Sequence, residues 1–314
     1  MLYRRGGRGI RLRDVVILLV SVVAVSLSAP QVFASPYSSA VLADSPVAYY
    51  RFEDGASTNG STAVNSGSTG SAINGVYNGT GMTLVANTFN GGANGLGNAI
   101  DLANLSSVNY VRVPDHNDLD LTTSATLEAW INAPSASTAA NTWARILDKA
   151  RSTSYMLFLD ATTGRPAEQN ASHTLVDDQD VRGGGWTHVV ATFDSNVGWK
   201  MYVNGVLSVS DTNKTVLQTN SNVLDLFKDP LSTIDRYTGQ ADEIAIYSTA
   251  LSAEQVLTHY TAASQIATVP EPSTAVLMAA SAASLGIAPF VRRLRVRSVR
   301  VRRRATAATR RSAL

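Results

Sequence analysis

Few carboxylates in this chain are spaced for the hydrolysis of a glycan. Retaining glycosidases use two carboxylates about 5–5.5 Å apart, which alternate positions of one strand provide. Asp118 and Asp120 alternate but lie in an expected loop, whereas Glu128 stands alone on its expected strand. No Gly-x-Ser-x-Gly segment occurs, and the four histidines show no metal-ligand spacing. We therefore expect a protein that is not an enzyme, with glycan hydrolase as the less favoured alternative.

Aromatic residues near loop boundaries, together with an acidic loop, are the groups that could hold a sugar. The candidate ligand-binding residues are Trp143, Trp186, Tyr237, Asp177, Asp178 and Asp180. Tryptophans more often pack in the core or on a sheet face, so both interpretations of Trp143 and Trp186 stay open. Trp130 lies within a strongly apolar run, and we assign it to the core.

The stretch 183–210 gives the clearest structural signal. From Trp186 to Phe193, β-branched and aromatic side chains alternate between two faces, which predicts a strand. A second strand is expected at 199–203 and a third at 206–210, joined by Asn204-Gly205, a pair typical of a tight hairpin turn. The stretch is therefore expected to be an antiparallel meander whose apolar face is covered by a second sheet.

The rest of the central chain also favours strands. The other expected strands are 47–53, 76–77, 99–102, 108–113, 125–131, 143–148, 155–160, 173–176, 223–227 and 241–247. One helix is well signalled, because Ser252 and Gln255 form a capping box and Leu251 and Val256 a hydrophobic staple. This helix is expected to end near Ala263, with a linker at 264–269 behind it.

The N-terminus has the features of a secretory signal peptide. Arginines between positions 4 and 13 precede an apolar run from Val15 to Leu27, and Val32-Phe33-Ala34 offers residues that a signal peptidase accepts. We expect residues 1–34 to be removed. The alternative, an uncleaved membrane anchor, is less favoured because the apolar run is shorter than the roughly 20 residues of a spanning helix.

The C-terminus has an equally ordered pattern at 270–314. Pro270-Glu271-Pro272 precedes an apolar run at 274–291, which is followed by an arginine-rich tail. This order resembles the PEP-CTERM sorting signal, and the resemblance implies a transmembrane span and an exosortase-type sorting enzyme as partner. Pro289 within the span and the long tail depart from the usual pattern. A simple C-terminal membrane anchor is the alternative.

The charges of the two ends hide an acidic centre. Residues 1–34 and 270–314 hold fifteen of the 26 Lys and Arg residues but two of the 24 acids, which leaves 11 basic and 22 acidic residues between them. This balance disfavours a nucleic-acid partner. The chain has no cysteine, so an exported domain folds without disulfides. A single large β-sandwich at 35–263 has the length to do so.

Four segments resemble a known family in their order along the chain. They are SPVAYYRFED, ATLEAWINAP, GGWTHVVATFD with MYVNGVLSVS, and GQADEIAIYSTALSAEQVLTHY. Together they resemble laminin-G-like domains of the concanavalin A-like lectin/glucanase superfamily, from about Ser45 to Ala262. The resemblance implies an all-β, two-sheet antiparallel jelly roll, in which the first expected strand pairs with the last.

That implied pairing suggests a calcium site. Calcium takes six to eight oxygen ligands from carboxylates and carbonyls. If the first and last strands adjoin, Glu53, Asp54 and Asp242 come to one end of the pair, with Asn65 beside them. Related domains often hold calcium at such a place, although an aspartate is common where this chain has Asn65. The alternative is that these side chains bind neighbouring loops.

Together these features predict an exported binding module that reaches the cell surface or the extracellular matrix after membrane anchoring. Its expected ligand is an extracellular polysaccharide or a surface protein. The competing hypothesis is a structural or adhesive surface protein without a defined sugar site.

Overall fold

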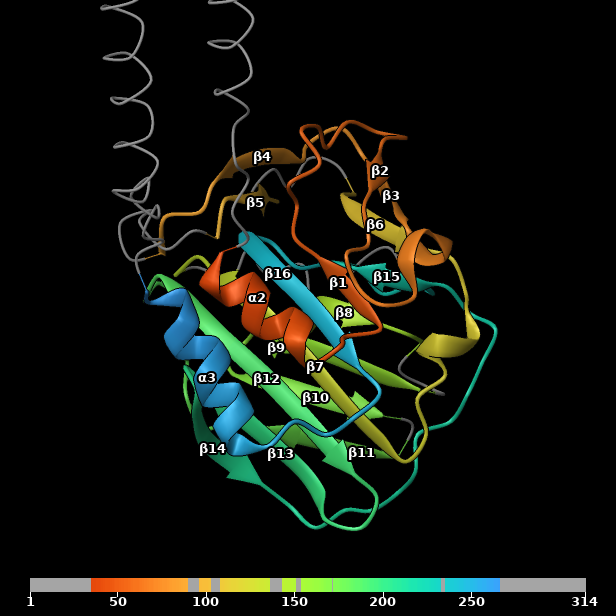
Figure 1. Ribbon diagram of the computed structural model, residues 1–314, viewed down its shortest axis with the longest axis vertical. Coiled ribbons are helices and arrows are strands. Elements are labelled where there is room, and N and C mark those ends of the chain that lie inside the picture. Colours follow the sequence, from red (N-terminus) through yellow and green to blue (C-terminus); the bar gives the residue numbers. More distant parts are fainter. Residues whose placement is uncertain are drawn as a thin grey trace, which may run out of the picture. The chain divides into compact units, whose positions relative to one another are not determined.

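The central part of the chain forms a β-sandwich. The computed structural model describes residues 35–89, 96–102, 108–135, 143–150, 154–170, 172–232 and 235–265. Two antiparallel sheets pack face to face, which confirms the predicted fold class, and two helices lie on the outer face of one sheet (Figure 1). The predicted signal peptide and sorting signal fall outside the described residues. Within those residues, no helix is both long and apolar enough to cross a membrane.

The first sheet, sheet A, carries the helices and has eight strands in the described part of the chain. Its path is β14 (Val206–Ser210), β13 (Gly198–Val203), β12 (Trp186–Asp194), β7 (Ser124–Asn132), β16 (Gln240–Tyr247), β5 (Asn98–Asp101) and β4 (Thr83–Ala86), and β1 (Ala48–Tyr50) pairs with β16 beside this path.

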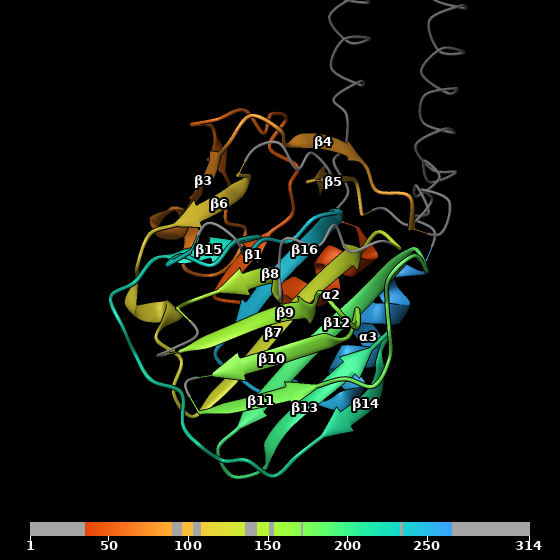
Figure 2. The same cartoon turned by 180° about the vertical axis from the view of Figure 1, so that it is seen from behind.

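The second sheet, sheet B, also has eight strands within the described ranges. Its order is β11 (His173–Val176), β10 (Pro166–Asn170), β9 (Tyr155–Asp160), β8 (Trp143–Asp148), β15 (Leu224–Leu226), β6 (Tyr110–Val113), β3 (Gly75–Asn78) and β2 (Thr62–Ala63). Seen from behind, β8 to β11 lie in front of β7 and β12 (Figure 2). The described residues also include two short 3₁₀ turns, Gly70–Ile73 and Asn117–Leu119.

The predicted meander is confirmed as β12, β13 and β14. Asn204 and Gly205 both have positive φ, 52° and 79°, as the tight turn between β13 and β14 requires. Val189, Ala191 and Phe193 of β12 point into the core between the sheets. Trp186 and Val190 point to the opposite face, where they pack beneath the helices. Both faces of this strand are therefore buried.

The long-range pairing of the first and last strands is also confirmed. Ala48 of β1 lies opposite Ile246 of β16, and Tyr50 lies opposite Ile244. Asn65 closes the neighbouring loop, since its side chain accepts the N–H of Tyr49 at 2.7 Å. The strand ends at Tyr50 rather than at the predicted Glu53. Phe52, two residues beyond it, has a φ of 53°, which is outside the extended region of a strand.

The helices bury a second apolar layer on the outer face of sheet A. Helix α3 (Ala253–Ala263) has the predicted capping box between Ser252 and Gln255 and ends where it was expected. Its Val256 is fully buried and Tyr260 packs beside it. Trp130 of β7 is fully buried in the same layer, as predicted for a core residue.

The expectation of a single helix is wrong. A second helix, α2 (Pro36–Ala43), precedes the first strand and packs against α3. Its sequence has no clear apolar stripe, so periodicity gives no sign of it. Two features explain its formation: Ser35 caps its first turn, and Pro36 supplies a preset helical φ at the start. Burial of Tyr37 and Val41 then holds it on the sheet.

Candidate functional site

Loops from both sheets meet at one end of the sandwich and carry the predicted ligand-binding residues. In sheet A, Trp186 at the start of β12 and Gln240 at the start of β16 both lie opposite Asn132 at the end of β7. In sheet B, Trp143 at the start of β8 lies opposite Asp160 at the end of β9. The register thus places these strand ends, and the loops that continue them, around one small pocket.

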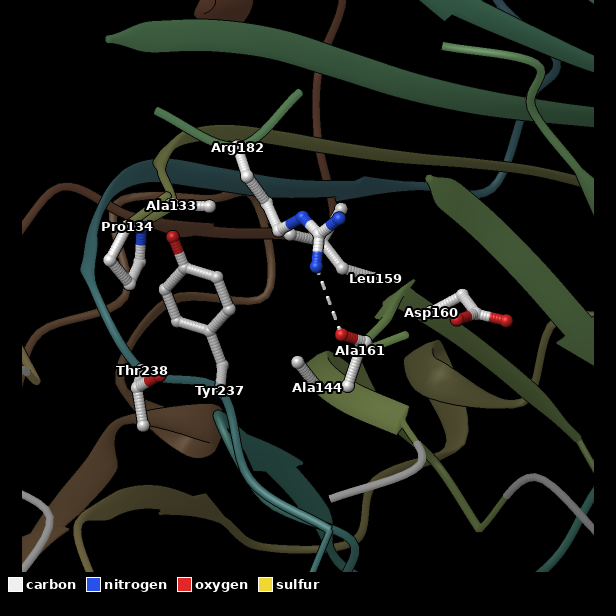
Figure 3. Close-up of a pocket in the computed structure, with 9 residues that line it drawn as sticks. All are labelled: Ala133, Pro134, Ala144, Leu159, Asp160, Ala161, Arg182, Tyr237 and Thr238. Atoms are coloured by element: carbon white, nitrogen blue, oxygen red, sulfur yellow. Dashed lines mark hydrogen bonds between the residues drawn. The ribbon is translucent and has the colours of Figure 1, made fainter. Parts of the chain in front are cut away.

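This Tyr237 pocket opens between the two sheets (Figure 3). Its lining residues are Ala133, Pro134, Ala144, Leu159, Asp160, Ala161, Arg182, Tyr237 and Thr238. Tyr237 forms one wall, and its hydroxyl donates to the carbonyl oxygen of Gln240 at 2.9 Å. The cavity volume is about 20 Å³, which is room for one or two water molecules. A ligand larger than water therefore contacts the rim of this pocket rather than its interior.

Arg182 is the cation among the lining residues of the pocket. Its guanidinium makes two hydrogen bonds to Asp180, at 2.9 and 2.7 Å, and donates to the carbonyl oxygen of Ala161 at 3.2 Å (Figure 3). The hydrogen bonds from Arg182 lower the pKa of Asp180, so this carboxyl is ionised at neutral pH. Gly164 makes the pairing possible, because its φ is +73° and a Cβ there would collide with Asp180 and Arg182. The loop 177–185 is thereby fastened to the turn after β9.

The three predicted aromatic residues share this end but face three different regions. Tyr237 is 2% exposed within the core between the sheets. Trp186 lies on the helix-covered face of sheet A, where its indole N–H donates to Thr88 at 3.3 Å. Trp143 lies half-buried on the outer face of sheet B, packed on Phe158. The three rings do not form one platform, and Trp143 is the most accessible of them.

The acidic loop contains one buried and two exposed carboxylates. Asp177 is fully buried and accepts the backbone N–H of Gln179 at 2.8 Å. Asp178 is exposed, and Asp180 is exposed but paired with Arg182. Asp178 and the Asp180–Arg182 pair are consequently the charged groups that this loop presents to solvent. Arg182 was missed from the sequence; its spacing of two from Asp180 in a loop rich in glycine was the available signal.

The outer face of sheet B carries a band of ion pairs that the sequence did not reveal. Arg145 of β8 is fully buried and lies 3.4 Å from each of three aspartates, Asp148, Asp229 and Asp235. Its guanidinium lies 4.9 Å from the centre of the Trp143 ring. On the next strands Arg112 makes two hydrogen bonds to Asp225, at 2.9 and 2.8 Å. Each of these four aspartates therefore contacts at least one cation.

Glu128, the lone acid on its strand, has a structural role. It is fully buried and accepts hydrogen bonds from Tyr37 at 2.8 Å and from Tyr247 at 2.7 Å. His188 and His259 also contact it, at 2.8 and 3.1 Å. Burial alone would raise the pKa of Glu128, but the charge of His259 and the histidine hydrogen bonds lower it well below its usual value. His188, predicted to be structural, is part of this network.

The structure does not bring the four predicted calcium ligands together as one open set of oxygens. Both oxygens of Glu53 accept from Asn98, and those of Asp54 accept from Val64 and Tyr77. The side chain of Asn65 is used by the backbone around it, as described above, and by Gly67.

Asp242, the remaining member of that set, is fully buried and accepts from the side chain of Asn87 at 2.7 Å. Burial and the neighbouring Glu243 raise its pKa well above the usual value. In the described residues, no group of three or more His, Asp or Glu side chains is placed to hold a metal ion. Calcium binding at these four residues stays a prediction, and it requires their present hydrogen bonds to be exchanged for metal contacts.

The sheet order defines the class of the fold: an antiparallel two-sheet β-sandwich. Residues 105–257 match the laminin-G-like family model described as the concanavalin A-like lectin/glucanases superfamily. The resemblance stated from the four sequence segments is thereby confirmed. No curated protein matches the chain.

Solved structures with a similar fold include the binding domains of two toxins. The binding domain of Paraclostridial Mosquitocidal Protein 1 is 14% identical with a TM-score of 0.52, over 70% of this chain and 52% of that one. The ligand binding domain of Botulinum neurotoxin serotype D, in complex with N-acetylneuraminic acid, is 17% identical with a TM-score of 0.50, over 71% and 52%. This chain thus spans about half of each toxin domain.

A third similar structure is a domain of comparable size. Domain 4 of AbnA, an extracellular arabinanase from Geobacillus stearothermophilus in complex with arabinotriose, is 20% identical over 68% of this chain and 98% of that one, with a TM-score of 0.49. At these identities the likenesses to the toxin domains show a shared fold.

Proposed function

We propose that this chain is an exported, non-catalytic module that binds polysaccharide at the cell surface or in the extracellular matrix. The rim of the Tyr237 pocket is the proposed contact surface, with Trp143, Asp178, Asp180 and Arg182 as its ligand-facing groups. The observation that carries the proposal is the convergence of loops from both sheets at this one end. Rigid strands with loops at their ends are a common way to hold binding residues in place.

The chemistry of the rim suits hydroxyl-rich ligands. The Asp180–Arg182 pair offers carboxylate acceptors and guanidinium donors about 3 Å apart, in an orientation that two hydrogen bonds fix. Vicinal hydroxyl groups of a sugar match such a paired donor and acceptor. Trp143 adds an apolar ring on which a sugar face can stack. The bound sugar of the serotype D toxin domain and the arabinotriose of the arabinanase domain guide only the choice of probes.

The ion pairs on the outer face of sheet B support a module that does not hydrolyse its ligand. A retaining glycosidase needs one ionised carboxylate as nucleophile and one protonated carboxyl as acid. Asp225 is paired with Arg112 and Lys228, and Arg145 draws three further aspartates together. A carboxylate oxygen that is engaged by a guanidinium or ammonium group is less available to attack a sugar, which disfavours the nucleophile role on this face.

Export and sorting belong to the same proposal. The signal peptide at 1–34 and the Pro270-Glu271-Pro272 motif lie outside the described residues, so their support is the order of motifs in the sequence. An exosortase-type enzyme is the proposed partner in the membrane. The absence of cysteine agrees with a domain that needs no oxidation step after export.

A glycan array tests the proposal. The full-length chain, purified in mild detergent, is applied to an array that includes arabinotriose and N-acetylneuraminic acid glycans. We expect the chain to bind at least one glycan class on the array. In Trp143→Ala this binding is expected to be about tenfold weaker or more, because a stacking ring is lost. Tyr110→Ala, on the same outer face but two strands away, is the matched control and is expected to bind normally. If the chain binds no glycan on the array, the result favours an adhesive protein without a sugar site and overturns the proposal.

A further inference from the structure

A second pocket lies at the opposite end of strand β7. This Asp118 pocket forms where β7 begins and β16 ends, and its cavity volume is about 240 Å³. Its polar lining residues are Asn117, Asp118, Asp120, Thr122, Thr123, Ser124 and Ser248, with Val47 and Leu121 as the apolar ones. It is much roomier than the Tyr237 pocket and has the space that the latter lacks.

The lining groups match a ligand that is rich in hydroxyl groups. Thr, Ser and Asn side chains can both donate and accept, and the two carboxylates accept. This combination of donors and acceptors suits the hydroxyl groups of a sugar, each of which is also donor and acceptor. None of the lining residues is aromatic or cationic. The pocket therefore favours a neutral sugar held by hydrogen bonds at its edge, and disfavours apolar ligands and acidic sugars.

The walls of the pocket are fixed before any ligand arrives. Thr69 donates its hydroxyl to Asp118 at 2.7 Å, and the backbone N–H of Asn220 donates to Asp120 at 3.2 Å. The hydroxyl of Ser124 donates to the carbonyl oxygen of Ser248 at 2.6 Å.

Each of these carboxylates uses one oxygen for its bond to the protein. Among the described residues no hydrogen bond is formed by the other oxygen of either, so both carboxylates keep a free acceptor. A preorganised site of this kind loses little conformational entropy on binding.

We propose that the Asp118 pocket binds a terminal neutral monosaccharide unit, and that the module is therefore bivalent. This inference rests on the proposed function, because it adds a second sugar site to the first. Strand β7 (Ser124–Asn132) separates the two pockets and spans roughly 30 Å at about 3.3 Å per residue. Sites at opposite ends of a rigid strand engage different glycan chains. The module then links polysaccharide chains rather than only adhering to one.

Hydrogen–deuterium exchange of the full-length chain in mild detergent tests the site directly. The probes are galactose, mannose, glucose and N-acetylglucosamine, each added alone. At least one is expected to slow exchange in peptides covering 117–124. The double variant Asp118→Asn with Thr123→Val is expected to weaken this protection about tenfold or more, because hydrogen bonds to a charged and a hydroxyl group are lost. Thr83→Val, an exposed threonine on edge strand β4, is the matched control.

Light scattering with galactomannan tests the bivalency. The unchanged chain is expected to raise the scattering by linking chains, and the double variant is expected to bind galactomannan without raising it. Sugar binding at the Tyr237 rim with no protection of 117–124 overturns this inference and leaves the proposed function intact. Sugar binding at neither end overturns both. Protection of 117–124 by calcium alone, without any sugar, identifies a cation site and also overturns the inference.

Discussion

The ring nitrogens of His259 lie between two carboxylates: Nδ1 is 3.1 Å from Oε1 of Glu128, and Nε2 is 3.0 Å from Oδ2 of Asp44. Carboxylates only accept hydrogen bonds, so both nitrogens donate and the ring is an imidazolium. Burial alone would lower the pKa of His259, but the charges of Glu128 and Asp44 and their hydrogen bonds raise it. Strand β7, helix α3 and the end of helix α2 are thus joined through one imidazolium ring.

Loss of Glu128 is expected to destabilise the domain strongly. Glu128→Ala leaves the Nδ1–H of the buried His259 ring and two buried tyrosine hydroxyls without their acceptor. Breaking a buried, hydrogen-bonded ion pair costs about 3–5 kcal/mol. Urea unfolding of the full-length chain measures the change in the free energy of unfolding. Glu254→Ala, an exposed acid at the start of α3, is the control, and a Glu128→Ala change no larger than the control would contradict the structural role.

The stability of the domain is expected to fall as the pH rises above neutral. The folded-state pKa of His259 is raised above its usual 6.5, so the folded state holds the proton more tightly than the unfolded state. Its contribution is fully present below pH 6.5 and is lost as the pH rises through the folded pKa. Glu128 acts in the opposite range: its lowered pKa gives stability above about pH 4.3 that is lost on acidification.

Melting temperatures between pH 6 and 9 test the alkaline limb. Asp44→Asn removes one carboxylate beside His259 and is expected to move the loss of stability to lower pH. His173 contributes in the same direction, because its hydrogen bond to Glu168 raises its pKa, so a smaller slope remains in a His259→Gln variant. A melting temperature that rises steadily from pH 6 to 9 would refute the assignment of the imidazolium.

Trp130 of β7 is expected to support stability, whereas Trp143 of β8 is expected to support glycan binding. Trp130 is fully buried under the helices, and Trp130→Ala is expected to cost about 3–5 kcal/mol of stability. Trp143 is half-buried on an outer face, and Trp143→Ala is expected to cost less stability while reducing glycan binding. Parallel unfolding and binding measurements separate the two effects. Equal losses of stability in both variants would disprove the proposed difference between the two tryptophans.

Gly164 is expected to be irreplaceable in the loop that carries Arg182. Gly164→Ala forces a side chain into a left-handed backbone and against the Asp180–Arg182 pair, at a cost of about 1–3 kcal/mol. Glycan affinity at the rim is expected to fall with it. Gly184→Ala is the control, since nothing lies within 4 Å of its added Cβ. Similar unfolding and binding curves for the two variants would argue against the fastened loop.

Much of the fold follows from local patterns in the sequence. The hairpin at Asn204-Gly205, the cap at Ser252 and the alternation along β12 are each set by residues close together in the chain. Strand β10 was missed because Gly164-Arg165-Pro166 has the composition of a turn. Pro166 is nevertheless the first residue of that strand, a position where proline removes no required hydrogen bond.

The candidate site was predicted only in part. The sequence placed Trp143, Tyr237 and the acidic loop near loop boundaries, but it did not indicate that these loops lie at one end of the sandwich or that the side chains face different regions. Which side of a sheet end a ring covers depends on strand register and on the bulge between Arg145 and Leu147. The partners of Glu128 come from four separate segments. Such a network is visible only after the chain has folded.

One experiment tests the central claim, that the sandwich holds a glycan without cleaving it. Each glycan that binds the chain on the array is incubated in solution with the full-length chain. Its mass is then measured by mass spectrometry. We predict that the glycan is bound and that its mass is unchanged after prolonged incubation. A shortened glycan, or an array on which the chain binds no glycan, would contradict the account.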